Sequence, residues 1–160
     1  MPELTILPAL DRAIKGVLER MFFIEALSDP DTDAPESGPG LQAMLTFEGA
    51  PPGWFALRVT NAAARSISAD FLGVEESEVS GQQVEAVICE LANMICGSVL
   101  SSIESTATFR LGPPRIVPAV DGADRSPEIT LHSVRIASGV LTAVLAMEGP
   151  ACSAAAKFAS

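Results

Sequence analysis

The sequence predicts an α/β domain in which a largely antiparallel sheet packs against helices, one of them long. Three patterns predict this class. Apolar residues recur at helical spacing near the N-terminus and across the middle of the chain, residues 54–60 alternate like a half-buried strand, and two apolar segments flank a short turn near the C-terminus. The 160 residues have the length of one ordinary domain, and 48% hydrophobic residues can form a buried core. We therefore expect a single domain over residues 1–160, with residues 149–160 as a flexible tail.

The first predicted helix runs from Pro8 to Leu27. Its apolar residues recur every three or four positions: Leu10, Ile14, Val17, Leu18, Met21 and Phe22. Pro8 suits the first turn of a helix, where its missing N–H would lack a partner in any case. Residues 28–40, rich in Asp, Pro and Gly, are expected to form a solvated loop.

Two strands and a short helix should follow. Residues 41–47 and 54–60 are predicted strands, separated by a turn rich in Gly and Pro. Asn61 is then expected to cap a short helix that runs to about Phe71 and is closed by Gly73.

The longest predicted helix begins at Ser80 and ends near Ser105. Ser80 and Gln83 fit a capping box, in which each side chain satisfies a backbone N–H of the other residue. At about 100° per residue, one side of this helix collects its expected core residues. These are Val84, Ile88, Leu91, Ala92, Ile95 and Val99.

The C-terminal part of the chain predicts further strands. Residues 108–111 are expected to form a brief strand, and residues 112–128 a connection rich in Pro and Asp. Residues 129–137 and 140–147 then flank Ser138-Gly139 and predict a hairpin with a tight turn. Both arms are nearly continuously apolar, which favours a place in the middle of a covered sheet.

Charge and composition exclude several functions. Ten basic and twenty acidic residues give a net charge of −10, so nucleic acid is not an expected partner. Neither a basic-then-apolar leader nor an uninterrupted apolar stretch of about 18 residues is visible, so we expect a cytoplasmic protein without membrane insertion. Three cysteines and one histidine do not suggest a disulfide framework or a zinc site, and Cys89 and Cys96 are expected to be small buried residues.

The side of the long helix opposite its core residues carries Ala86, Glu90, Asn93 and Gly97. Glu90 and Asn93 are three residues apart and are therefore neighbours on the helix surface. An acid and an amide then lie side by side, next to residues with almost no side chain, so that another surface could approach closely. Taken alone, this pair is more typical of an ordinary solvated helix face than of a functional site.

The surrounding segment narrows the interpretation. Glu90-Leu-Ala-Asn-Met-Ile-Cys-Gly97 resembles the signature of the CheC/CheX/FliY phosphatase family, which is Glu-x-x-Asn on a long helix. The family commonly has Asp or Ser four residues before the Glu, where this chain has Ala86. It also has a Pro some twenty residues after the Asn, to which Pro113, Pro114 or Pro118 corresponds only roughly. A single Glu-x-x-Asn favours the CheX type over the CheC type, which usually carries two.

The resemblance implies a CheC/CheX-like fold and a phosphatase that hydrolyses the aspartyl phosphate of a CheY-like response regulator. By the same resemblance, Asn93 would enter the regulator's active site and orient the attacking water, and Glu90 would dock to the regulator's lysine. The chain would need no cofactor of its own, because the regulator's acidic residues hold Mg²⁺. It would also form a homodimer through sheet edges, for which the apolar C-terminal hairpin offers a surface.

Two other interpretations stay open. One is a non-catalytic interaction domain of the same fold, comparable to the flagellar switch proteins; Ala86 favours it, whereas the presence of both Glu90 and Asn93 opposes it. The other is an unrelated small α/β enzyme or ligand-binding domain that uses this helix face as the wall of a concave pocket. His132, in a predicted strand, is expected to be structural under each interpretation.

Overall fold

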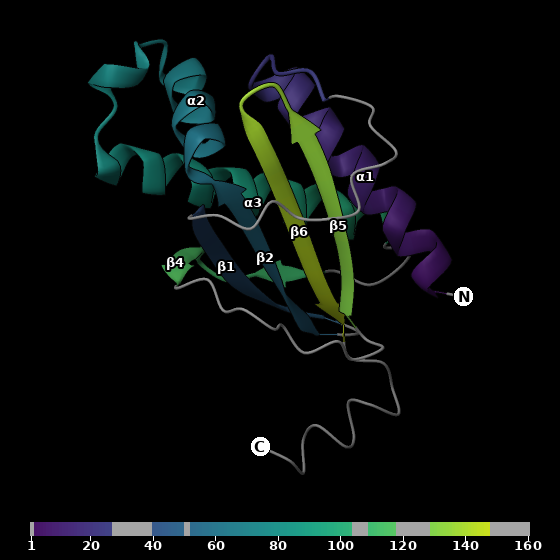
Figure 1. Cartoon of the computed structure of the whole chain (residues 1–160). Coiled ribbons are helices and arrows are strands. Elements are labelled where there is room, and N and C mark those ends of the chain that lie inside the picture. The colour runs from purple at the N-terminus through teal and green to yellow at the C-terminus, as the bar shows by residue number, and fades with distance from the viewer. Residues whose placement is uncertain (1, 27–39, 50–51, 104–108, 118–128, 148–160) are drawn as a thin grey trace.

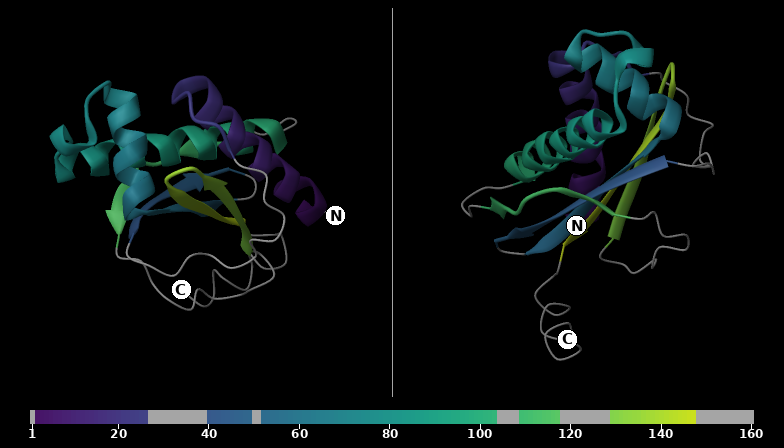
Figure 2. Two further views of the ribbon diagram at one scale, coloured as in Figure 1. Left: turned by 45° about the horizontal axis from the view of Figure 1, so that its top comes forward. Right: turned by 90° about the vertical axis from the view of Figure 1, so that its left-hand side faces the viewer.

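In a computed structural model of the chain, the described residues form three α-helices that cover one face of a six-stranded antiparallel sheet (Figures 1 and 2). The structure describes residues 2–26, 40–49, 52–103, 109–117 and 129–147. The predicted tail at 149–160 lies outside these residues. The architecture confirms the predicted α/β class, with an antiparallel sheet and one long helix.

Helix α1 spans Pro2–Met21, so it begins six residues before the predicted start and contains Pro8. It also ends earlier than predicted, because the backbone reverses at Phe23, whose φ is 56°. The N–H of Ile24 then donates to the carbonyl of Leu18 over 2.9 Å. A residue with positive φ cannot continue a right-handed helix, which explains why the apolar periodicity alone placed the end too late. Residue 27, the predicted end, lies outside the described residues.

The sheet has the order β3-β1-β2-β6-β5, and β4 also pairs with β1. The long strands are β1 (Gly40–Glu48), β2 (Gly53–Thr60), β5 (Ile129–Ile136) and β6 (Gly139–Met147). Alternate residues of these strands face the helices and form the core together with α1 and the two following helices. Their buried members include Ala43, Leu45, Phe55, Leu57, Leu141, Ala143 and Leu145.

Helix α2 spans Asn61–Leu72 and follows β2 without a loop. The prediction that Asn61 caps it is wrong, because Thr60 is the N-cap and Asn61 is the first helical residue. Thr60 makes no side-chain cap; its hydroxyl instead accepts the N–H of Val140 over 3.2 Å. Gly73 closes the helix as predicted, with a φ of 70° and its N–H donated to the carbonyl of Ala69.

Helix α3 spans Gly81–Ile103 and follows a short 3₁₀ turn, η1 (Glu76–Glu78). The capping box is confirmed: the N–H of Ser80 donates to Oε1 of Gln83 over 2.9 Å, and the N–H of Gln83 donates to Oγ of Ser80 over 3.1 Å. All six predicted core residues of this helix are buried. Its last predicted residues, 104 and 105, lie outside the described part of the chain.

By length and composition alone, residues 81–102 of α3 could cross a membrane, which corrects the expectation that no segment is apolar enough. Such a test is also passed by the core helix of a soluble protein. Half of this apolar segment is buried inside the fold, where α3 contacts α1, α2 and β1. Its apolar character therefore has an explanation in the packing of this domain.

The C-terminal hairpin corrects two details of the prediction. Its turn consists of Ala137 and Ser138, and Gly139 is already the first residue of β6. A Cβ at Gly139 would lie against the hydroxyl of Thr60, so close packing against the start of α2 explains this glycine. Only one arm of the hairpin lies inside the sheet: β6 is between β2 and β5, whereas β5 forms an edge of the described sheet.

The other edge holds two short strands, β3 (Arg110–Leu111) and β4 (Arg115–Val117), which pair with β1. The first confirms the predicted brief strand. The second lies within the predicted connection 112–128, so that prediction is wrong for residues 115–117, because three residues beside several prolines are too few to show a strand pattern. The remainder of the predicted loop, residues 118–128, is outside the described residues.

Candidate functional site

Helix α3 presents two different sides. The side facing the sheet and α1 is fully apolar, with Ile88, Leu91 and Ile95 completely buried. On the side turned away, Glu90 is exposed and Asn93 is half-buried. Their three-residue spacing places the carboxylate and the amide next to each other, as the sequence predicted.

Small residues flank this pair along the helix. Ala86 lies one turn before Glu90 and is exposed, and Gly97 lies one turn after Asn93 and is half-buried. A Cβ built on Gly97 would meet only Cδ2 of Leu111, at 3.9 Å. Strand β3 therefore lies beside the C-terminal end of this face, while the face itself is open for close approach. We call the surface formed by Ala86, Glu90, Asn93 and Gly97 the α3 face.

The strands beside this face were only partly visible in the sequence. Leu111 precedes Gly112, whose N–H donates to the carbonyl of Thr46 over 2.7 Å and anchors the segment to β1. The local signal is the short alternation of Phe109 and Leu111 with polar residues before the prolines. The pairing that positions it depends on β1, more than sixty residues earlier in the chain.

The thiols near the site are poor nucleophiles. Burial raises the pKa of Cys96 to about 12, and Cys96 is part of the core. Burial, and secondarily the charge of Glu85, raises the pKa of the half-buried Cys89. A raised pKa keeps a thiol protonated at neutral pH, which disfavours attack on phosphorus. Cys152 lies outside the described residues.

The single histidine has a structural partner. Nε2 of His132, on β5, lies 2.8 Å from Oδ1 of Asp11 on α1. Nζ of Lys15 lies 3.1 Å from the other carboxylate oxygen of Asp11. This cluster ties α1 to the edge strand, in agreement with the structural role expected of His132.

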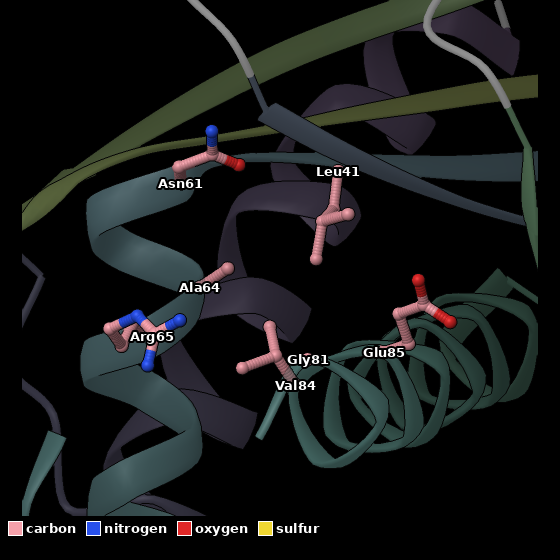
Figure 3. Close-up of a pocket in the computed structure, with 7 residues that line it drawn as sticks. All are labelled: Leu41, Asn61, Ala64, Arg65, Gly81, Val84 and Glu85. Carbon is pink, nitrogen blue, oxygen red and sulfur yellow. The ribbon is translucent and has the colours of Figure 1, made fainter. Parts of the chain in front are cut away.

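A pocket of about 330 Å³ opens between the first turns of α2 and α3 and the start of β1 (Figure 3). Its polar lining comes from Asn61, Arg65 and Glu85. Neither Glu90 nor Asn93 lines it, so these two side chains do not form the wall of this pocket. Within the described residues, no group of three or more His, Cys, Asp or Glu side chains is arranged to hold a metal ion.

Comparisons with known proteins agree with this architecture. A sequence model of the family described as "Chemotaxis phosphatase CheX" matches residues 41–131, which is more than half of the chain. No functionally curated protein matches the sequence.

Solved structures share the fold at low sequence identity. CheX of Borrelia burgdorferi, solved as a complex with CheY, BeF₃ and Mg²⁺, has a TM-score of 0.71 at 16% identity, covering 88% of this chain and 96% of that chain. CheX of Desulfovibrio desulfuricans has a TM-score of 0.70 at 19% identity, covering 89% and 99%. The FliM middle domain of Vibrio alginolyticus is also similar, with a TM-score of 0.57 at 12% identity, covering 90% and 92%.

An antiparallel sheet covered by helices, one of them long, is the fold that this chain shares with these structures of the CheC/CheX/FliY class. The chain belongs to the chemotaxis phosphatase CheX family, because that family's sequence model covers most of the domain.

Proposed function

We propose that this protein hydrolyses the aspartyl phosphate of a CheY-like response regulator, with the α3 face as its docking surface. The observation that supports this most strongly is the adjacent pair Glu90 and Asn93, accessible on the outer side of α3 in a member of the CheX family. The likeness to a CheX solved together with CheY and Mg²⁺ supports the same partner and a metal ion held on the regulator's side.

Asn93 is proposed to act on the attacking water. An amide donates through its NH₂ group and accepts through its oxygen, so it can hold a water molecule in line with phosphorus. Phosphoryl transfer depends mainly on positioning and on stabilisation of charge, so no nucleophile is required from this chain. The protonated thiols and the paired His132 are consistent with this mechanism, because neither is needed.

Glu90 is proposed to anchor the complex. A carboxylate at an interface can form a charge-assisted hydrogen bond with a lysine, which fixes the register of docking. Ala86 and Gly97 add almost no side-chain bulk on either side, so the regulator's surface can come close to the helix. The same contact would bring the Asn93 amide into the regulator's active site.

The test separates turnover from binding. Asn93→Ala should slow phosphate release about a hundredfold or more under single-turnover conditions, the scale of losing one oriented transition-state contact, while regulator binding stays nearly unchanged. Glu90→Ala should weaken binding as well as turnover, because it removes the anchor. Glu85→Ala is the matched control, since Glu85 is an exposed acid of the same helix that lines the pocket instead. If Asn93→Ala releases phosphate as fast as the parent, the catalytic role is wrong.

A non-catalytic interaction domain is the second candidate. Two observations favour it: Ala86 replaces the Asp or Ser common in the family, and the fold is shared with the FliM middle domain. In that case the regulator would bind to the parent protein without any acceleration of phosphate release. The same single-turnover experiment, with binding measured in parallel, distinguishes the two candidates.

We further propose a homodimer in the cytoplasm that forms through β5. This strand is an edge of the described sheet, and edge strands present unpaired N–H and C=O groups to a second chain. Leu131, near the start of β5, is half exposed and would be covered by such pairing. Sedimentation of a monomer at micromolar concentration would contradict the dimer.

A further inference from the structure

The C-terminal ends of α1 and α2 lie at the top of Figure 1 and of the right-hand view in Figure 2, and several exposed apolar side chains belong to these ends. Phe22, directly after α1, stacks on Phe71 of α2 with ring centroids 4.8 Å apart, and this contact joins the two helix ends. Five of the seven large hydrophobic side chains that the described residues expose belong to these ends. They are Met21, Phe23, Phe71, Leu72 and Val74, and we call them the paired-end patch.

Phe23 is the most unusual member of the patch. Its side chain is 88% exposed and its φ is 56°. A bulky residue in the left-handed region is strained, and such strain persists only where other interactions compensate for it. The hydrogen bond from the N–H of Ile24 to the carbonyl of Leu18 holds this backbone conformation, but the Phe23 side chain itself gains almost no burial from it. An outward-held aromatic side chain of this kind is what anchors protein–protein interfaces.

The surroundings of the patch are acidic. Six exposed acids lie in the last turns of α1 and α2 or within six residues after them: Glu19, Glu25, Asp70, Glu75, Glu76 and Glu78. The nearby exposed basic residues are Arg20, in the last turn of α1, and Arg65, in the first half of α2. The guanidinium of Arg65 already donates to the carbonyls of Glu76 and Val79, each over 3.0 Å. The C-terminal ends of both helices add the negative ends of two helix dipoles.

We propose that the paired-end patch is a docking surface for a basic amphipathic helix of a partner protein. The apolar face of such a helix would cover Phe23 and its neighbours, and its lysine and arginine side chains would meet the acidic rim. This proposal concerns a surface distinct from the α3 face and does not depend on the phosphatase reaction.

Charge argues against the other occupants. A second copy of the chain that docked through this same patch would bring its acidic rim against an identical acidic rim. An anionic lipid surface would be repelled in the same way. None of the chain's segments outside the described residues carries a net positive charge: residues 27–39 contain four acidic and no basic residues, residues 104–108 one acidic residue, residues 118–128 three acidic and one basic residue, and residues 148–160 one of each. A partner helix with positive flanks is the occupant that the rim favours.

The experiment measures fluorescence anisotropy of a labelled synthetic helix of about 18 residues, with Leu at positions i, i+3, i+4 and i+7 and Lys elsewhere. The parent protein should bind it in the micromolar range, more weakly as ionic strength rises. Phe23→Asn should raise Kd about tenfold or more while leaving thermal stability unchanged or higher, because Asn tolerates a positive φ. Leu7→Asn is the matched control: Leu7 is 43% exposed at the other end of α1, and its replacement should leave Kd unchanged.

The rim is tested separately with the double variant Asp70→Lys, Glu76→Lys, which should weaken binding and flatten its salt dependence. Equal binding of a peptide in which Glu replaces every Lys would overturn the charge argument. No binding of the basic peptide to the parent, or equal binding to Phe23→Asn, would overturn the docking surface. Self-association of the parent that Phe23→Asn abolishes, or Phe23-dependent binding to anionic vesicles, would assign the patch to a different occupant and overturn the proposal.

Discussion

Replacing Gly97 by alanine should stabilise the protein and at the same time impair its docking to a regulator. Gly97 lies inside α3, where glycine is less favourable than alanine by about 1 kcal/mol. A Cβ at this position meets only Cδ2 of Leu111, at 3.9 Å, which is ordinary van der Waals contact. With no steric cost to subtract, Gly97→Ala should gain about 1 kcal/mol in unfolding free energy, or about 2–4 °C in Tm for a domain of this size.

The same substitution should impair function although it raises the unfolding free energy. The added methyl group projects from the α3 face, on which the proposed mechanism needs close approach of the regulator. Gly97→Ala should therefore weaken regulator binding and slow phosphate release, although the protein is more stable.

Gly81→Ala is the matched control for this substitution. A Cβ at Gly81, the first residue of the same helix, meets nothing within 4 Å. It should stabilise by about 0.4–1 kcal/mol without affecting the regulator. Thermal unfolding and single-turnover phosphate release on both variants check the pair of effects. If Gly97→Ala and Gly81→Ala are equally active, the α3 face is not the surface that the regulator approaches.

Three further perturbations test the fold. Gly53→Ala should lower the unfolding free energy by about 1–3 kcal/mol or more, because the added Cβ would collide with the carbonyl oxygen of Ala146 on the neighbouring strand. An unchanged urea midpoint would refute this packing. Arg65→Met keeps the apolar stem but loses both hydrogen bonds to the carbonyls of Glu76 and Val79, and should lower Tm by an amount equivalent to about 1 kcal/mol. For Asp11, burial raises the pKa of the carboxyl group, but hydrogen bonds with His132 and Lys15 outweigh burial and hold the pKa below its ordinary 3.8. The ionised Asp11 carboxylate therefore stabilises the folded state above pH 3.8, and this stabilisation is lost as pH falls through the lowered pKa. The difference in unfolding free energy between the parent and Asp11→Asn should accordingly shrink to zero in acid. A difference that does not change with pH would contradict this.

Predictions that rest on local geometry are confirmed. The capping box of Ser80 and Gln83 needs only two residues three apart, and the structure shows both hydrogen bonds. The exposure of Glu90 opposite a buried stripe follows from the helical repeat alone, because the strongly apolar side must face the core. The closing role of Gly73 follows from its tolerance of a positive φ.

Predictions that needed a distant partner are the ones that the structure corrects. Asparagine is preferred over threonine as an N-cap residue. Thr60 nevertheless takes the N-cap position, because β2 ends at Thr60 and α2 begins at the next residue. The Thr60 hydroxyl is then used by Val140, eighty residues away in sequence. Gly139 was read as a turn residue, whereas its packing against Thr60 is what excludes a larger side chain.

The sequence by itself determined the helices, the long strands and the adjacency of Glu90 and Asn93, since each of these depends on spacings within one element, and its composition determined the negative charge. Only the tertiary structure decided the order of the strands, the edge position of β5 and the small strands beside the α3 face. It also decided that Phe23 remains outside while Phe22 stacks on Phe71. The physical reason is that burial and strand pairing are set by contacts between segments far apart in the chain, and no local pattern records which segments will meet.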